Sequence, residues 1–194
     1  MPKPIQGPER VPMLSLEEAR SAAEAAGLPE VFASLSVFRI LLRDPELASA
    51  IAGQLQHLLR GKHFDGRLRE LVILRIGWAT GSVYEWTQHW RVARLMEIRE
   101  DDLLGVRDWR NHADFGHAER AVLAATDETL EHGVIGEETW RACESALGSI
   151  EARLEMVVAI GNWQLFSSLL RSLNVPLEEG VEPWPPDGLA PQLQ

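Results

Sequence analysis

The placement of proline constrains this chain more than any other feature of its sequence. Prolines gather in the first 12 residues and again from Pro176 onward, with only Pro29 and Pro45 between them. No proline occurs from Glu46 to Val175. A proline in a helix interior costs about 3 kcal/mol, so a proline-free stretch of this length permits long continuous helices.

Hydrophobic spacing and capping residues divide this stretch into helices. Apolar residues recur at helical intervals, and no segment alternates strictly over four or more residues, so we expect an all-α fold without a sheet. The helix over 66–80 is apolar nearly all round, so it should be central and buried. We expect about eight or nine helices, over 15–27, 29–42, 44–60, 66–80, 82–96, 100–106, 118–132, 137–145 and 149–173.

The domain organisation follows from the same pattern. We expect one all-helical domain over 15–175, with Pro-rich arms at 1–14 and 176–194. The second arm carries Trp184 among prolines, a residue that either packs on a partner subunit or stays free.

Charge and cysteine content exclude several classes of function. The chain has 19 Lys and Arg against 29 Asp and Glu, a net charge of −10. Such a surface repels phosphate backbones and anionic lipids, so we expect no nucleic-acid or membrane partner. No apolar run approaches the roughly 18 residues of a membrane span, and residues 1–12 lack the apolar core of a signal peptide, so we expect a cytoplasmic protein. The lone Cys143 excludes an internal disulfide and any intramolecular dithiol mechanism.

The densest group of chemically capable residues lies between Arg67 and His89. Glu85 and His89 are four residues apart on one helix face, and Ser82 lies one turn earlier at the helix start. The turn at Thr80-Gly81 folds two helices back on each other, which brings Glu70 toward that face. A buried histidine beside carboxylates carries and delivers a proton near neutral pH.

Spacing alone also supports purely structural roles for these residues. Ser82-x-x-Glu85 has the form of a capping box, in which each side chain bonds the other's backbone. Glu85 and His89 form an ordinary helix pair in this interpretation, and Arg67 and Glu70 are surface residues at a helix start.

The region 67–103 resembles the carboxymuconolactone decarboxylase and alkylhydroperoxidase D-like superfamily. The resemblance rests on Arg67-x-x-Glu70-Leu71, an apolar helix, Gly81-Ser82, Tyr84-Glu85-Trp86-x-x-His89-x-x-x-Ala93, and a downstream helix at 98–103. It implies an all-α domain and a homo-oligomer, whether a dimer, a trimer or a hexamer.

The peroxidase branch of that superfamily carries Cys-x-x-Cys-x-x-x-His. The two cysteines fall on Ser82 and Glu85, and the histidine falls on His89. Neither matching residue is a thiol, so thiol peroxidase chemistry is disfavoured.

The decarboxylase branch resembles this chain more closely, because its Glu-x-x-x-His falls on Glu85 and His89. The resemblance implies loss of carbon dioxide from a γ-carboxylated butenolide or a related small cyclic carboxylate or lactone, without cofactor or metal. His89 is then the proton donor, Glu85 orients it and sets its charge, and Glu70 is a further orienting carboxylate or relay.

Five further residues are candidates for substrate binding. Ser82 at a helix N-terminus favours an anionic group, and Arg67 or Arg75 can pair with a second carboxylate. Arg75 is equally well explained by an ion pair with Glu70 or Glu85. Tyr84 and Trp86 of the motif complete the set. A competing hypothesis is an oligomeric binding or accessory protein that retains only the pocket.

Other constellations carry weaker signals. Ser82 and His89 lack the strand–elbow–helix context of a serine hydrolase. His112-x-Asp114-x-x-His117 is compatible with a metal site, but solvated loop histidines explain it better. Asn162 and Gln164 line a pocket or bond backbone at a subunit interface, and the sequence leaves both open.

Overall fold

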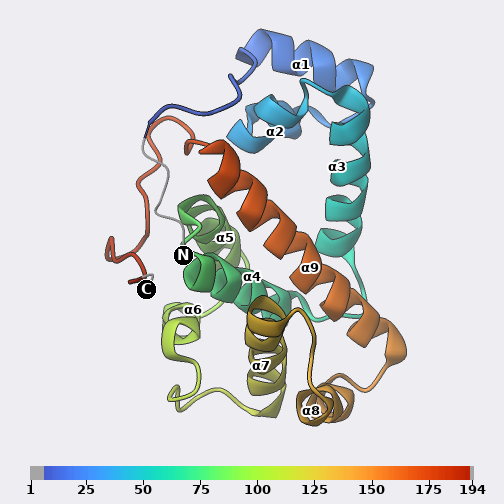
Figure 1. Cartoon of the computed structure of the whole chain (residues 1–194), viewed down its shortest axis with the longest axis vertical. Coiled ribbons are helices and arrows are strands. Elements are labelled where there is room, and N and C mark those ends of the chain that lie inside the picture. The colour runs from blue at the N-terminus through green and yellow to red at the C-terminus, as the bar shows by residue number, and fades with distance from the viewer. Residues whose placement is uncertain (1–6, 193–194) are drawn as a thin grey trace. The chain divides into compact units, whose positions relative to one another are not determined.

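A computed structural model describes residues 7–192, and none of these lies in a β-strand. The described part of the chain holds nine α-helices and two short 3₁₀ helices, which confirms the all-α expectation (Figure 1). It forms two compact units, a larger one of residues 61–167 and 183–192 and a smaller one of residues 7–60 and 168–182. The single domain over 15–175 stays a prediction, and residues 1–6 and 193–194 of the expected arms lie outside the described residues.

The smaller unit is built from the first helices of the chain and the end of the last. Its elements are α1 (Leu16–Ala25), η1 (Glu30–Ser34), α2 (Ser36–Leu41), α3 (Pro45–Arg60) and residues 168–173 of α9 (Ile150–Leu173). Ser15 caps α1 as predicted, because its hydroxyl accepts from the backbone N–H of Glu18 at 3.2 Å. The carboxylate of Glu18 in turn accepts from the backbone N–H of Ser15 at 2.8 Å. Asp44 caps α3 through a single bond, in which its carboxylate accepts from the backbone N–H of Leu47 at 3.1 Å.

The single helix predicted over 29–42 is wrong. Leu35 adopts an extended conformation, with φ −88° and ψ 126°, and divides the segment into η1 and α2. The apolar spacing runs on through the break, so periodicity cannot reveal it. The backbone N–H of Ser36, at the start of α2, is bonded instead by Glu178 at 2.8 Å.

The larger unit contains all the residues predicted to act in chemistry. Its elements are α4 (Gly66–Thr80), α5 (Val83–Leu95), α6 (Glu100–Gly105), η2 (Val106–Asp108), α7 (His117–His132), α8 (Glu137–Leu147) and residues 150–167 of α9. Helix α4 packs against both α5 and α7 and is buried along most of its length, as its apolar composition predicts. None of the helices within residues 7–192 combines the length and apolarity needed to cross a membrane.

The C-terminal segment of the larger unit packs on a group of tryptophans from α4 and α5. The ring of Trp184 lies 6.0 Å from Trp78 and 6.2 Å from Trp86, measured between centroids. The indole of Trp86 donates to the carbonyl of Pro185 at 2.8 Å. Arg107 stacks on the same rings and forms two bonds to Asp187, at 2.7 and 3.0 Å. Trp184 therefore packs within its own chain, an outcome that neither expectation for this residue included.

Candidate functional site

The α4–α5 hairpin fixes the backbone of the site. Gly81 ends α4 in the left-handed region at φ +71°, and the N–H of Ser82 bonds back to the carbonyl of Gly77 at 2.8 Å. Gly77 also permits the closest approach of the helices, since a Cβ there would lie 3.0 Å from the backbone nitrogen of Trp86. This tight antiparallel pairing brings the start of α4 beside the later turns of α5.

Glu70 and His89 meet across that pairing. Nδ1 of His89 lies 2.7 Å from Oε2 of Glu70, whose side chain is fully buried. Arg69 donates to the other oxygen of Glu70 at 3.2 and 3.3 Å. Both oxygens of this buried carboxylate are thus engaged, and Glu70, not Glu85, makes the direct bond that orients His89.

Trp163 holds the opposite edge of the imidazole. Its indole Nε1 donates to Nε2 of His89 at 3.0 Å, and the two rings meet edge to face. Trp163 lies outside the motif at 67–103, and its contact with His89 depends on how α9 packs. Arg69 is a second residue that sequence reasoning left out of the site.

Charge around His89 acts in two directions. Burial disfavours the imidazolium, but the Glu70 carboxylate with its hydrogen bond, and Glu85 beyond it, outweigh burial and raise the pKa of His89. Arg69 opposes them as a nearby positive charge. The carboxylates of the site therefore shift His89 toward the imidazolium form.

Glu85 is buried close to this pair without the bond that the sequence suggested. Its Oε2 has no hydrogen-bond partner. Burial raises the pKa of Glu85 to about 7, with His89 acting against the rise and Glu70 adding to it. At neutral pH this side chain is divided between the carboxylic acid and the carboxylate.

The predicted capping box at Ser82-x-x-Glu85 is wrong. Ser82 is the N-cap of α5, but its side chain makes no capping bond, and its Oγ is buried without a partner. The two residues instead place an unpaired hydroxyl oxygen and an unpaired carboxyl oxygen, both buried, one turn apart at the start of α5.

The two arginines considered for substrate binding are held in ion pairs elsewhere in the larger unit. Arg67 bonds Asp102 at 2.9 Å and also Glu119. Arg75 bonds both oxygens of Asp127, at 2.6 and 3.1 Å, and also the carbonyls of Val106 and Arg107. The alternative of an ion pair for Arg75 was thus right in kind, but its partner is Asp127 and not Glu70 or Glu85.

Tyr84 and Trp86 are buried in the hairpin. Trp86 stacks on Trp90 with centroids 5.8 Å apart, and its indole N–H is bonded to Pro185. Trp86 thus lies in the tryptophan group described above, and its role in substrate binding stays a prediction.

The possible metal cluster includes a residue from α6 that the sequence did not suggest. Asp102, His112 and Asp114 offer donor atoms within 4.8 Å of one another. Arg67 already pairs with Asp102, and Arg99 with Asp114 at 2.9 Å. His117 is exposed as expected, but the solvated-loop prediction is wrong for His112, whose ring packs on Phe115 at 4.2 Å.

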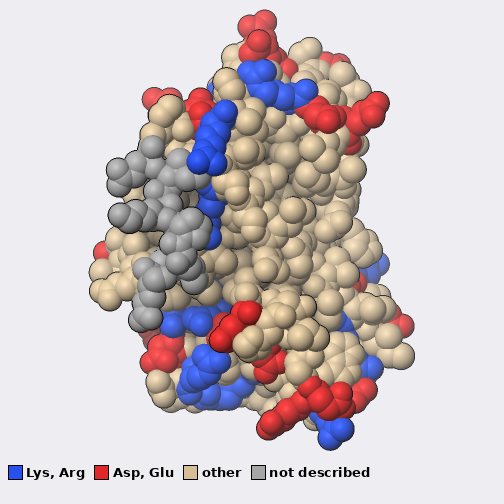
Figure 2. Space-filling model, viewed as in Figure 1, with Lys and Arg blue, Asp and Glu red and all other residues tan. Residues whose placement is uncertain are grey.

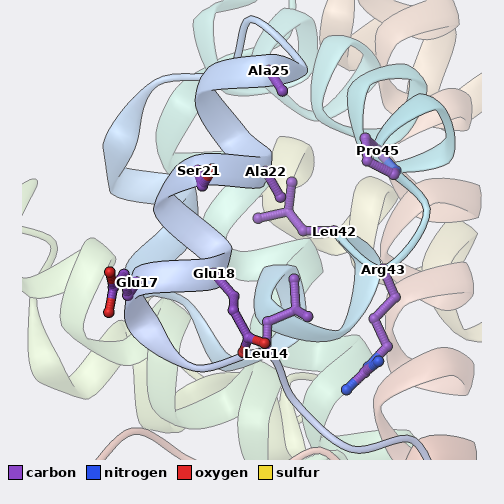
Figure 3. Close-up of a pocket in the computed structure, with 9 residues that line it drawn as sticks. All are labelled: Leu14, Glu17, Glu18, Ser21, Ala22, Ala25, Leu42, Arg43 and Pro45. Atoms are coloured by element: carbon purple, nitrogen blue, oxygen red, sulfur yellow. The ribbon is translucent and has the colours of Figure 1, made fainter.

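A surface pocket of about 600 Å³ lies in the smaller unit, away from all of these residues in sequence. In Figure 3 the side chains of Leu14 and Leu42 lie between α1 and the turn at Arg43–Pro45. Two of its three charged side chains are engaged, because Glu18 accepts from the backbone N–H of Ser15 and Arg43 donates to the carbonyl of Pro12, while Glu17 is the third. The pocket contains no residue predicted to act in chemistry.

Comparison with known proteins identifies the fold family. Residues 45–128, which contain the α4–α5 hairpin, match the carboxymuconolactone decarboxylase family. The chain is similar to that family over this segment. The match confirms the resemblance seen in the motif at 67–103 and covers Glu70, Ser82, Glu85 and His89. No curated protein matches the chain.

Solved structures show the same fold over most of this chain. A protein of unknown function from Agrobacterium tumefaciens, a putative antioxidant defence protein AhpD, has 19% identity and a TM-score of 0.65, over 70% of this chain and 92% of that one. A peroxidase-related AhpD-core protein from Ralstonia eutropha has 16% identity and a TM-score of 0.71, over 90% and 95%. The debrominase Bmp8 in complex with 2,3,4-tribromopyrrole has 18% identity and a TM-score of 0.69, over 91% and 95%.

Proposed function

We propose that this protein is a carboxymuconolactone decarboxylase-like enzyme that carries out cofactor-independent decarboxylation or proton transfer on a small cyclic carboxylate or lactone. The observation that carries the proposal is the bond from Nδ1 of His89 to the buried carboxylate of Glu70 at 2.7 Å. A buried carboxylate that holds one ring nitrogen stabilises the imidazolium. The other nitrogen, Nε2, accepts from Trp163, so a substrate has to replace that contact before Nε2 can act.

The chemistry requires a proton at carbon. When the bond to the departing carboxylate breaks, carbon dioxide leaves and the electron pair enters the conjugated lactone as an enolate. Once a substrate oxygen has replaced the indole contact, His89 takes up a proton from water at Nε2. As imidazolium it gives this proton to the carbanion carbon and becomes neutral, while Glu70 holds Nδ1. The unpaired oxygens of Ser82 and Glu85 supply O–H donors to the enolate oxygen, since the pKa of Glu85 near 7 keeps part of it protonated.

Family and neighbours support this proposal at different levels. The family match supports the fold and the position of the Glu-x-x-x-His motif. The Bmp8 structure contains a small brominated pyrrole, which supports a planar, ring-sized ligand in a protein of this fold.

A thiol peroxidase remains disfavoured for this chain. Its one cysteine, Cys143, is buried on α8, and its S–H donates to the carbonyl of Ala121 at 3.4 Å. Burial raises the pKa of Cys143 to about 11, so the thiol stays protonated at neutral pH and is a poor nucleophile.

One observation favours the alternative of a binding or accessory protein. Both ring nitrogens of His89 are satisfied inside the chain, Nδ1 by Glu70 and Nε2 by Trp163. A site that serves only to bind a ligand has no need of a free nitrogen on its histidine.

We also infer a cytoplasmic homo-oligomer. The superfamily resemblance supports an oligomer, and so does a row of exposed apolar side chains along α9, namely Ile150, Leu154, Val157, Val158 and Leu165.

Turnover of γ-carboxymuconolactone tests the enzyme hypothesis directly. We expect purified protein to release carbon dioxide and to remove the ultraviolet absorbance of the lactone. His89→Gln should abolish this while retaining the fold, because glutamine fits the helix but cannot carry the proton. His57→Gln, at an exposed position on α3, is the matched control and should keep full activity. Full activity in His89→Gln would remove His89 as the proton donor.

A panel of related lactones and cyclic acids separates the two hypotheses if that substrate is not consumed. Ligand binding, measured by calorimetry without any product formation across the panel, would put the binding-protein alternative first.

A further inference from the structure

Trp163 forms a hydrogen bond with Nε2 of His89, the nitrogen that delivers the proton in the proposed reaction. Its indole N–H points at Nε2 over 3.0 Å, and the planes of the two rings stand at 83°. Trp163 is fully enclosed on α9, with 1% of its surface exposed, so its ring is held by packing. The superfamily motif in the hairpin does not include this residue, which lies far along the chain from His89.

An indole N–H can only donate a hydrogen bond, and this fixes what His89 must be. Nε2 has to present its lone pair, so the proton of neutral His89 sits on Nδ1 and faces Oε2 of Glu70. An imidazolium would carry N–H groups on both nitrogens. Its Nε2–H would then point at the indole N–H of Trp163 across 3.0 Å, which removes the bond and sets two donors against each other.

The groups that surround His89 thus work against each other. Glu70 from α4 and Glu85 from α5 favour the positive charge, while Arg69 from α4 disfavours it. Trp163 from α9 adds a fourth influence, one that acts through a hydrogen bond to the neutral form and not through net charge.

We propose that Trp163 is a positioning residue that holds His89 as the neutral Nδ1–H tautomer in the resting site and blocks Nε2 until a ligand replaces the indole contact. The inference rests on the proposed function only in its last step, because the tautomer and the block exist whether or not the protein turns over a substrate. A ligand that frees Nε2 has to offer an acceptor oxygen to the indole N–H, as a carboxylate or a lactone carbonyl does.

The resting tautomer can be read without any variant. In protein labelled with ¹⁵N-histidine, long-range ¹H–¹⁵N spectra distinguish a protonated from an unprotonated ring nitrogen, and the signal missing in His89→Gln identifies His89. We expect an unprotonated Nε2 and a protonated Nδ1 at pH values above the His89 transition. A proton on Nε2 in the neutral form would overturn the proposal.

The strength of the contact is measured by titration of Trp163→Phe. Phenylalanine keeps an aromatic ring but has no N–H, so the neutral form loses one hydrogen bond and the pKa of His89 should rise by about one pH unit. Trp140→Phe, on α8 and with its ring packed beside Arg153, is the matched control and should leave the titration of His89 unchanged. An unchanged or lower pKa in folded Trp163→Phe would overturn the proposal.

These measurements test the role of Trp163 separately from the enzyme hypothesis. If no lactone is consumed but the tautomer and the shift appear as expected, the positioning role of Trp163 stands and the enzyme hypothesis fails. If turnover is seen but the shift is absent, the enzyme hypothesis stands and the role of Trp163 fails.

Discussion

At Glu85, burial opposes charge inside the hairpin. The side chain has 4% of its surface exposed, and Oε2 has no hydrogen-bond partner, so the folded state binds a proton more tightly than the unfolded chain does. The pKa of Glu85 is raised from 4.5 to about 7. A group of this kind lowers the free energy of unfolding as pH rises between these two values, because the native state must either keep the proton or bury a charge.

Glu85→Gln should remove the loss of stability that burial of this carboxyl group causes as pH rises. Glutamine has the same shape without the titrating proton, so the free energy of unfolding of the variant should fall less from pH 4.5 to pH 7 than that of the wild type. The difference is at most about 3.5 kcal/mol above pH 7, from a shift of about 2.5 pKa units at about 1.4 kcal/mol each. Urea denaturation at several pH values measures it. Glu138→Gln, at an exposed position on α8, serves as control and should leave the pH profile unchanged. Parallel profiles for Glu85→Gln and wild type would contradict the assignment.

The residues of the site differ in how far the sequence could place them. Glu70 and His89 were expected to meet because one short turn joins their helices. Ser82 was misread, since a capping motif in sequence does not fix the direction of either side chain. Trp163 could not be placed at all, because its contact with His89 depends on the packing of a helix that begins more than 50 residues after α5 ends.

At the level of elements, the α4–α5 hairpin depends on close backbone contact at Gly77. A Cβ at this position would meet the backbone nitrogen of Trp86 at 3.0 Å and the Cβ of Glu85 at 3.3 Å. Backbone atoms cannot turn away as the end of a flexible side chain can. The separation of the two helices, and with it the reach from Glu70 to His89, is therefore set partly by this glycine.

Gly77→Ala should destabilise the protein despite the better helix propensity of alanine. We expect a loss of about 2 kcal/mol from overpacking, together with reduced turnover where activity is present. Gly53→Ala is the matched control, since Gly53 lies inside α3 with no atom within 4 Å of the added Cβ. That variant should gain about 0.5–1 kcal/mol from helix propensity. Thermal or urea denaturation of both variants gives the comparison, and stabilisation by Gly77→Ala would show that the helices move apart freely.

Helix positions were predictable where the signals are local. Asp65 caps α4 through a bond of 3.0 Å to the N–H of Leu68, and Gly81 ends the same helix, so the predicted bounds of 66–80 agree with the structure. The break at Leu35 was not predictable, because it is stabilised by Glu178, which lies 142 residues from its partner Ser36.

For the whole molecule, net charge opposes self-association, whereas exposed apolar surface favours it. A net charge of −10 keeps copies apart in solution. Figure 2 shows, however, a broad uncharged area where α9 runs in Figure 1. On α9 itself, the side chains of Leu154 and Ile150 are 60% and 64% exposed. An apolar row of this length on a highly charged chain is typical of a surface that another protein copy covers.

Leu154→Asp should therefore disrupt self-association without unfolding the chain. The aspartate is harmless in a free monomer, because position 154 is exposed, but in an interface it loses its hydration without a partner and repels its symmetry mate. Light scattering coupled to size-exclusion chromatography should show an oligomer for wild type and a smaller species for the variant. Val134→Asp, at a position 63% exposed beyond the end of α7, is the control and should keep the wild-type size. A monomeric wild type, or equal effects of both substitutions, would mean that α9 does not form the interface.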